Sequence, residues 1–130
     1  MFALDTNTLI YFFKGEGQVA ERLLATQPTQ IAVPAIVLYE LYFGIAKSTS
    51  PKRRIEQLHE MMELVTVLGF CANSAKETAN IRAVLEAKGT PIGPIDNLIA
   101  GTARANNAVL VTRNEREFSR VEGLRVENWY

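Results

Sequence analysis

Short apolar runs alternate with longer helical segments along this chain. Five of these runs have the length and the apolar, often β-branched composition of buried strands. The strands are expected at residues 2–5, 31–33, 65–68, 108–112 and 124–129. Alternation of this kind is typical of a parallel sheet whose two faces are covered by helices. We therefore predict an α/β fold, a three-layer α/β/α sandwich with a mostly parallel central sheet.

Glycine and proline residues mark where the intervening helices should begin and end. Helices are expected at residues 8–14, 19–26, 34–47, 51–64, from 73 or 74 to 88, and 95–106, with a polar loop or turn at residues 113–118. The segment 34–47 is apolar almost all round, which predicts a buried helix. Cys71, just before the fifth helix, is expected to be a small core residue.

The size and charge of the chain narrow its functional class. A length of 130 residues, 48% of them hydrophobic, fits one domain spanning residues 1–130 with its own core. The formal net charge is zero, so bulk electrostatics give no reason to expect a general nucleic-acid binder. A single cysteine excludes an internal disulfide, and neither a signal peptide nor a membrane-spanning run is evident. The expectation is a cytoplasmic protein.

Three carboxylates occupy unusual positions in this pattern. Asp5 ends the first strand, Glu40 is the only charge within the apolar helix, and Asp96 lies in the first turn of a helix after a Gly/Pro loop. Because ligands in open α/β sheets bind at the carboxyl ends of the strands, we expect the three to converge there. A buried carboxylate needs a partner, and the apolar segments carry few basic residues. Oxygen ligands without His or Cys favour Mg²⁺, with Mn²⁺ as a second choice.

Taken singly, each acid also has an ordinary explanation. Asp5 could be a helix cap, Asp96 a helix-start acid favoured by the macrodipole, and Glu40 a residue on an exposed helix edge. Taken together, they could hold a cation that activates water and stabilises phosphoryl transfer, so metal-assisted phosphodiester cleavage is the predicted chemistry. Arg113 and Arg116 follow the fourth strand and are candidates for contacting RNA phosphate.

Several short motifs extend over nearly the whole chain in a characteristic order. They are Leu4-Asp5-Thr6-Asn7, Tyr39-Glu40-Leu41-Tyr42-Phe43-Gly44, Ile81-Arg82, and the segments at residues 85–101, 111–118 and 123–129. In these motifs and their spacing the chain resembles the PIN-domain ribonucleases, and among them the VapC-type toxins of bacterial toxin–antitoxin modules. The resemblance implies a magnesium-dependent endoribonuclease, with transfer RNA among its candidate substrates, that forms a homodimer and is inhibited by a cognate antitoxin.

The resemblance also assigns roles to individual residues. It places the metal-binding and catalytic roles on Asp5, Glu40 and Asp96. Family members often carry a fourth acid just after the strand expected here at residues 108–112, where this chain has Asn114, with Glu117 three residues further on. Asn114 adds no negative charge, which argues against a tightly bound second metal. The residues expected to orient the acids or the attacking water are Thr6, Asn7, Thr112 and Asn114.

Two alternatives from other functional classes stay open at this point. An aspartyl-phosphate phosphatase also begins with an apolar strand ending in Asp, but such families usually place a second acid where this chain has Asn7. A catalytically silent binding module on the same fold would need none of the acids. Aromatic residues of the early helices exceed what one small core can hold, so some are expected to serve the dimer or the antitoxin: Tyr11, Phe12, Phe13, Tyr39, Tyr42 and Phe43.

Overall fold

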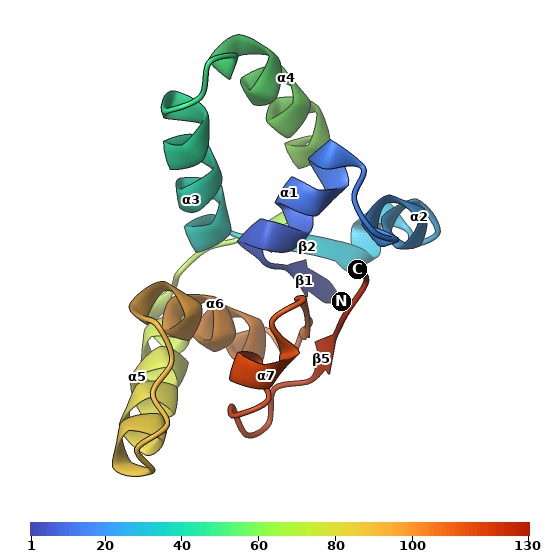
Figure 1. Cartoon of the computed structure of the whole chain (residues 1–130). Coiled ribbons are helices and arrows are strands. Elements are labelled where there is room, and N and C mark those ends of the chain that lie inside the picture. The colour runs from blue at the N-terminus through green and yellow to red at the C-terminus, as the bar shows by residue number, and fades with distance from the viewer.

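A computed structural model describes the whole chain, residues 1–130, as a five-stranded sheet flanked by helices (Figure 1). The strands lie in the order β3-β2-β1-β4-β5, and every neighbouring pair is parallel. Their bounds are β1 (Phe2–Leu4), β2 (Ile31–Pro34), β3 (Thr66–Leu68), β4 (Val109–Val111) and β5 (Val126–Glu127). The predicted α/β fold is confirmed, and all five expected strands are present.

The helices fall into two main groups about this sheet. Their bounds are α1 (Thr6–Lys14), α2 (Val19–Leu24), α3 (Ala35–Ala46), α4 (Pro51–Met62), α5 (Ala72–Ala87), α6 (Pro94–Ala105) and α7 (Glu115–Phe118), with one 3-10 turn at Pro28–Gln30. In Figure 1, α1, α3 and α4 gather above the sheet, whereas α5 and α6 pack together below it. None of these helices is long and apolar enough to cross a membrane.

β1 is the central strand, and it sets the position of the first acid. Phe2 and Ala3 pair with β2 on one side and with β4 on the other. Beyond β1, the Asp5 N–H donates to the carbonyl of Val111 at 3.1 Å, and the Asp5 side chain caps α1 by accepting the Thr8 N–H. The chain therefore turns from strand to helix at Asp5, at the carboxyl edge of the sheet.

One continuous core of 24 buried residues holds the sheet and the helices together. The strands contribute Leu4, Val33 and Leu110, and α4 contributes Leu58, all without solvent exposure. Burying side chains of this size stabilises the fold by about 1.5–3 kcal/mol each. The core fixes the ends of the central strands, and with them the turns that carry the acids.

Helix α3 is not buried all round, contrary to its sequence pattern. Only Val37 and Leu41 are buried, while Tyr39 and Phe43 are 61% and 57% exposed. The helix packs against α1, α4 and α6, and its aromatic face is left open. The prediction of a fully buried helix was wrong, because an apolar composition does not by itself provide a packing partner.

Two smaller expectations also fail. Cys71 is exposed at the N-cap of α5, because β3 has already ended at Leu68 and the turn between them runs over the surface. The segment 113–118, expected as a loop or turn, contains the one-turn helix α7, which begins directly after Asn114. This helix brings Glu117 within hydrogen-bonding distance of the turn that precedes α6.

Candidate active site

Asp5 is the most firmly held acid at the carboxyl edge. The residue is 6% exposed, and its Oδ1 accepts the Thr8 N–H at 2.9 Å. Burial raises the pKa of Asp5, hydrogen bonds from Thr112 and Thr8 lower it, and the charge of Glu40 raises it further. The carboxylate is thus fixed in position by neutral donors, and no basic side chain pairs with it.

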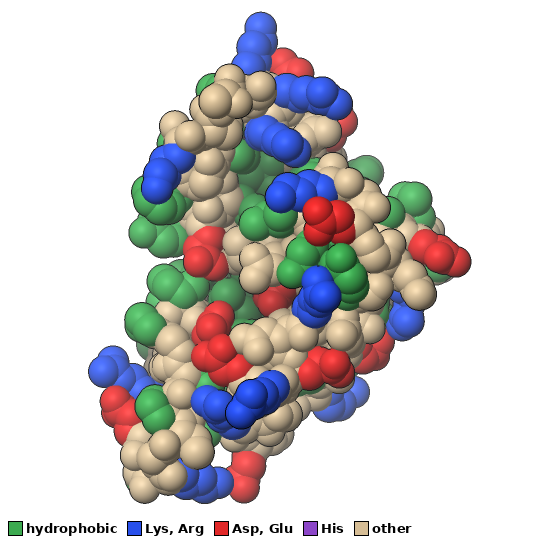
Figure 2. Space-filling model, viewed as in Figure 1, with side chains coloured by type: hydrophobic (Ala, Val, Ile, Leu, Met, Phe, Trp, Pro, Cys, Tyr) green, Lys and Arg blue, Asp and Glu red, His purple; other side chains and the backbone are tan.

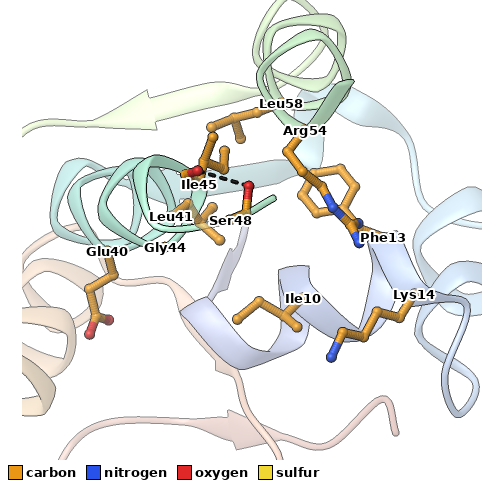
Figure 3. Close-up of a pocket in the computed structure, with 10 residues that line it drawn as sticks. All are labelled: Ile10, Phe13, Lys14, Glu40, Leu41, Gly44, Ile45, Ser48, Arg54 and Leu58. Carbon is orange, nitrogen blue, oxygen red and sulfur yellow. Dashed lines mark hydrogen bonds between the residues drawn. The ribbon is translucent and has the colours of Figure 1, made fainter. Parts of the chain in front are cut away.

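Glu40 reaches the same edge from α3. It is half-buried, and its Oε1 accepts a hydrogen bond from the Thr6 hydroxyl at 2.5 Å. Thr6 is the first residue of α1, so this bond joins the helix that follows β1 to the helix that follows β2. Figure 3 shows the Glu40 carboxylate directed away from the apolar side chains of Leu41 and Ile45. The partner of Glu40 is therefore a hydroxyl group and not a basic side chain.

Asp96 lies in the first turn of α6, where three other acids act on it. Burial raises the pKa of Asp96 to about 6, with further contributions from the charge of Glu117, a hydrogen bond to Glu117, and the charges of Asp5 and Glu40. The structure thus brings all three predicted acids within electrostatic reach of one another, together with Glu117.

Glu117 is held beside Asp96 by two hydrogen bonds. Its Oε1 accepts the Gly93 N–H at 3.1 Å, and its Oε2 accepts a hydrogen bond from the Asn114 amide at 2.6 Å. Gly93 is the N-cap residue of α6, so the first contact ties α7 to the start of the helix that carries Asp96. The fourth acid of the group is therefore Glu117, and Asn114 supports it.

We call Asp5, Glu40, Asp96 and Glu117 the acidic cluster. None of the four takes part in the salt bridges of the structure, and Figure 2 shows acidic side chains gathered around a hollow on this face. No three acidic, histidine or cysteine side chains are grouped tightly enough to hold an ion as they stand. The donor set itself, several carboxylates with an amide nearby and no basic partner, fits a hard divalent cation.

Three of the residues expected to orient the acids contact the cluster. Thr6 donates to Glu40, as described above. Thr112 is fully buried, hydrogen-bonds Asp5 through its side chain, and accepts the Asn114 N–H at 3.0 Å. The turn after β4 is thereby tied to the first acid by Thr112 and to the fourth acid by Asn114.

The other predicted residues lie around the rim. Asn7 is exposed in the first turn of α1. Arg116 is exposed on α7, and Arg113 lies against the rings of Tyr11 and Tyr130. Neither arginine is paired with an acid of the cluster.

The sequence contained one unused signal for Glu117. Asn114 and Glu117 have the N-x-x-E spacing that is typical of a helix start. In the structure Asn114 is the N-cap residue of α7 and Glu117 is its third helical residue. A helix predicted from this spacing would have pointed to Glu117 as an ordered acid near the edge of the sheet.

A groove of about 240 Å³ lies between α1, α3 and α4 (Figure 3). Lys14 and Arg54 contribute its positive charges, and Glu40 lies at its margin. The apolar side chains that line it are Ile10, Phe13, Leu41, Ile45 and Leu58. The groove therefore opens beside the acidic cluster, because Glu40 belongs to both.

Comparison with known proteins matches the PIN domain family to residues 2–124 of this chain. The tRNA(fMet)-specific endonuclease VapC of Salmonella typhimurium is 38% identical, over 98% of this chain and 97% of that protein. The protein of the same name from Shigella flexneri is 40% identical over the same shares. Ribonuclease VapC2 of Haemophilus influenzae is 36% identical, again over 98% and 97%.

Comparison with solved structures leads to the same group of proteins. A chain in the complex of Rickettsia felis VapBC2 with a promoter DNA fragment has a TM-score of 0.91 and 35% identity, covering 99% of this chain and 98% of that one. DNA-bound VapBC of Salmonella typhimurium has a TM-score of 0.92 and 38% identity with the same coverage. Because these relatives are ribonucleases, the two alternatives, an aspartyl-phosphate phosphatase and a catalytically silent binding module, are excluded. The chain belongs to the PIN-domain family, among the VapC toxin ribonucleases of VapBC toxin–antitoxin systems.

Proposed function

We propose that this VapC ribonuclease cuts initiator transfer RNA, tRNA(fMet), in a reaction that depends on Mg²⁺ held by the acidic cluster. The observation that carries the proposal is the convergence of four carboxylates without a basic partner. Clustered acids repel one another unless a cation neutralises them. The cytoplasmic location expected from the sequence stays a prediction.

The residues that would hold the ion in this proposal are Asp5, Glu40, Asp96 and Glu117. A bound divalent cation would lower the pKa of a water molecule and neutralise charge that develops on the phosphate. Mn²⁺ offers the same preference for oxygen ligands and should substitute.

The polar residues around the cluster keep the carboxylates oriented. The Thr8 N–H and the Thr112 side chain fix Asp5, so its position does not depend on substrate. The Thr6 hydroxyl positions Glu40 in the same way. Such supporting hydrogen bonds usually determine how well a metal-binding carboxylate works.

Asp96 provides a place for a proton at the same edge, beside Glu117. Burial and the neighbouring acids raise the pKa of Asp96 to about 6, so its carboxyl group holds a proton more readily than an ordinary one when no cation is bound. Loss of that proton would give the cluster its full negative charge. Asn114 and the Gly93 N–H would then hold Glu117 in place beside Asp96.

The choice of tRNA(fMet) rests on two relatives. The Salmonella typhimurium and Shigella flexneri proteins that carry this specificity in their names are 38% and 40% identical to the chain over nearly its full length. A shared substrate is the simplest proposal at this level of identity.

The groove between α1, α3 and α4 is the proposed antitoxin site. Its apolar walls fit an apolar segment of the partner, Lys14 and Arg54 fit acidic side chains, and Glu40 fits a basic one. Solved VapBC complexes of relatives contain the antitoxin as a second protein. No other residue would contact a Cβ added at Gly44, which also lines the groove. Gly44→Trp should therefore block antitoxin binding and leave RNA cleavage intact.

The exposed face of α3 is the proposed dimer contact. Tyr39, Tyr42 and Phe43 are 61%, 42% and 57% exposed there, and Figure 2 shows hydrophobic side chains along this edge of the molecule. By contrast, Tyr11, Phe12 and Phe13 are half-buried against the core. Light scattering should show a dimer that Phe43→Glu converts to monomer, and a strict monomer of the parent chain would contradict the proposal.

The test of the substrate and the metal uses purified protein with initiator and elongator methionine tRNA. We expect cleavage of the initiator tRNA with Mg²⁺ or Mn²⁺ and none with a chelator. Melting should shift in parallel, since an ion at about a hundred times its Kd stabilises the fold by about 2.7 kcal/mol. Cleavage that survives chelation would rule out the metal, and equal cleavage of both tRNAs would rule out the specificity.

A further inference from the structure

Arg113 lies against two tyrosine side chains on the rim of the site. Its guanidinium carbon is 3.6 Å from the centre of the Tyr130 ring and 5.7 Å from that of Tyr11. The two rings are 4.8 Å apart and nearly edge-on, at 74°. A hydrogen bond to the Tyr11 side chain raises the pKa of Arg113, and a guanidinium is charged at any physiological pH. We call these three residues the arginine stack.

The arginine stack is built on a fixed backbone. The carbonyl of Tyr130 accepts the Gln18 N–H at 2.9 Å, and the Tyr130 N–H donates to Asn128 Oδ1 at 2.9 Å. Gly17 adopts a positive φ of 63° directly beneath Tyr130, where an added Cβ would lie 2.8 Å from the Tyr130 carbonyl oxygen. Only glycine fits so close an approach. The ring against which Arg113 lies is therefore held in place.

Arg113 stands between two residues that contact the acidic cluster. Thr112 bonds Asp5, and Asn114 bonds Glu117. Adjacent Cα atoms are about 3.8 Å apart, so the backbone of Arg113 cannot be far from the acids. Its side chain contacts Tyr11 of α1, so its charge lies over α1 while its backbone stays between the two residues that contact the cluster.

The charge of Arg113 is available to a ligand. The side chain is exposed and takes part in none of the salt bridges of the structure. The acidic cluster beside it repels a polyanion, and the chain has no net positive charge to offset this. A free cation fixed beside the cluster is what an RNA strand would need in order to approach.

We propose that the arginine stack binds a backbone phosphate of the RNA strand next to the bond that is cut, an inference that rests on the proposed function. The ring of Tyr130 covers one face of the guanidinium and leaves N–H groups at its edge to bond two phosphate oxygens. The tyrosines hold the guanidinium plane in place, so little side-chain freedom is lost on binding.

Binding of RNA at different salt concentrations tests the arginine stack directly. The probes are labelled initiator tRNA and a short single-stranded RNA, and the Asp96→Asn protein is used so that the RNA stays intact. Arg113→Ala should weaken binding roughly tenfold. It should also lower the slope of log affinity against log salt by about 0.7, the value for one contact to a single strand.

Two further variants separate charge from stacking. Arg113→Lys keeps the charge, so the salt slope should stay, but the planar contact is lost and affinity should fall. Tyr130→Leu also keeps the charge and should weaken binding without changing the slope. In the parent background, Arg113→Ala should raise KM for tRNA with little change in kcat, since the phosphate it holds is not the one that reacts.

Arg125 provides the matched control. It is exposed, and it donates to the Asn107 carbonyl at 3.2 Å, before β4 begins and hence at the opposite edge of the sheet. Arg125→Ala removes the same charge and should leave both affinity and salt slope unchanged. If Arg125→Ala and Arg113→Ala lose the same RNA affinity, the effect comes from the overall charge of the protein and not from the arginine stack. That result would overturn the proposal.

The remaining outcomes are also decisive. If Arg113→Ala binds RNA with the same affinity and the same salt slope as the parent, the proposal is overturned. The proposed function would still stand in that case if the parent cleaves RNA. Loss of antitoxin binding with unchanged RNA binding would assign the arginine stack to the protein partner and equally overturn it. If Arg113→Ala does not fold, Tyr130→Leu and Arg113→Lys decide the question. A parent that cuts no RNA would refute the proposed function, and the binding slopes would still test the arginine stack.

Discussion

The two ends of helix α6 arrange their charges in opposite ways. At the C-terminal end, Arg104 Nε donates to Glu77 Oε2 at 2.7 Å, and its other nitrogens donate to Asn80 and to the Glu122 carbonyl. At the N-terminal end, Asp96 faces the charges of three other acids and no basic side chain. The helix macrodipole favours an acid at the N-terminus and a base at the C-terminus, so it suits both ends.

The difference between these ends separates stability from function. The Arg104 end joins α5, α6 and the turn before β5 through satisfied hydrogen bonds, which stabilises the folded state. The Asp96 end concentrates like charges, which destabilises the folded state until a cation is bound. Substitutions at the first end should therefore change stability alone, and substitutions at the second should change activity.

The largest effect is expected for Asp96→Asn. The substitution keeps the shape of the side chain and removes one charge from the cation site, so cleavage should fall a hundredfold or more, equivalent to roughly 3–4 kcal/mol for one electrostatic contact. Stability without metal should stay equal or rise, because repulsion within the cluster is relieved. The measurements are initiator tRNA cleavage with Mg²⁺ and chemical unfolding of both proteins.

Glu86→Gln is the control for this variant. Glu86 carries the same type of charge but lies on the exposed face of α5, paired with Arg82. It should leave cleavage unchanged. If Asp96→Asn cleaves tRNA at the parent rate, the N-terminal end of α6 is not the functional end, and the distinction drawn between the two ends is wrong.

A smaller effect, on stability, is expected for Arg104→Ala. The Arg104 and Glu77 side chains are 18% and 32% exposed, and removing the guanidinium leaves Glu77 partly buried without a partner. The free energy of unfolding should fall by about 2 kcal/mol, with cleavage per folded molecule unchanged. The Arg82–Glu86 pair is 65% and 54% exposed, so Arg82→Ala should cost at most about 0.5 kcal/mol. Equal losses for the two arginines would contradict this account.

The sequence predicted the fold because its signals were local and agreed with one another. The strand β4, for example, follows from an apolar run after helix α6, and its parallel direction follows from the alternation of strands and helices. Its place beside β1 was not predicted and comes from the structure. The exposure of α3 did not follow, since the pattern of Tyr39 and Phe43 describes composition and not the neighbours available in space. Burial is a property of the assembled layers.

For the candidate site, the sequence indicated which acids meet but not how they are held. Asp5, Glu40 and Asp96 were expected at one edge from their positions relative to strands and helices. The contacts of Glu117 to Gly93 and of Thr6 to Glu40 join residues that are 24 and 34 positions apart, and no local pattern predicts such pairs. No local pattern predicts the contacts of Arg113 either, because Tyr11 lies in α1 and Tyr130 lies far along the sequence from it.

The smallest expected effect is a pH dependence of stability in metal-free buffer. The pKa of Asp96 is raised from its ordinary value of 3.8 to about 6 in the folded state, so between these values the folded chain binds more protons than the unfolded chain. The stabilising contribution of protonated Asp96 is thus present below about pH 4 and is lost as the pH rises through about 6. Because Asp96 is only half-buried, solvent screening reduces this loss to about 1 kcal/mol.

The readout is the difference in unfolding free energy between the parent and Asp96→Asn, since carboxylates outside the acidic cluster contribute equally to both proteins. With rising pH the parent should lose stability relative to the variant, which has no proton to lose at this position. Mg²⁺ added at neutral pH should restore the parent and not the variant, because the ion takes over the neutralising role of the proton. A difference that stays constant with pH would show that neither burial nor the other acids raise the pKa of Asp96 in solution, and the contrast between the two ends of α6 would then fail.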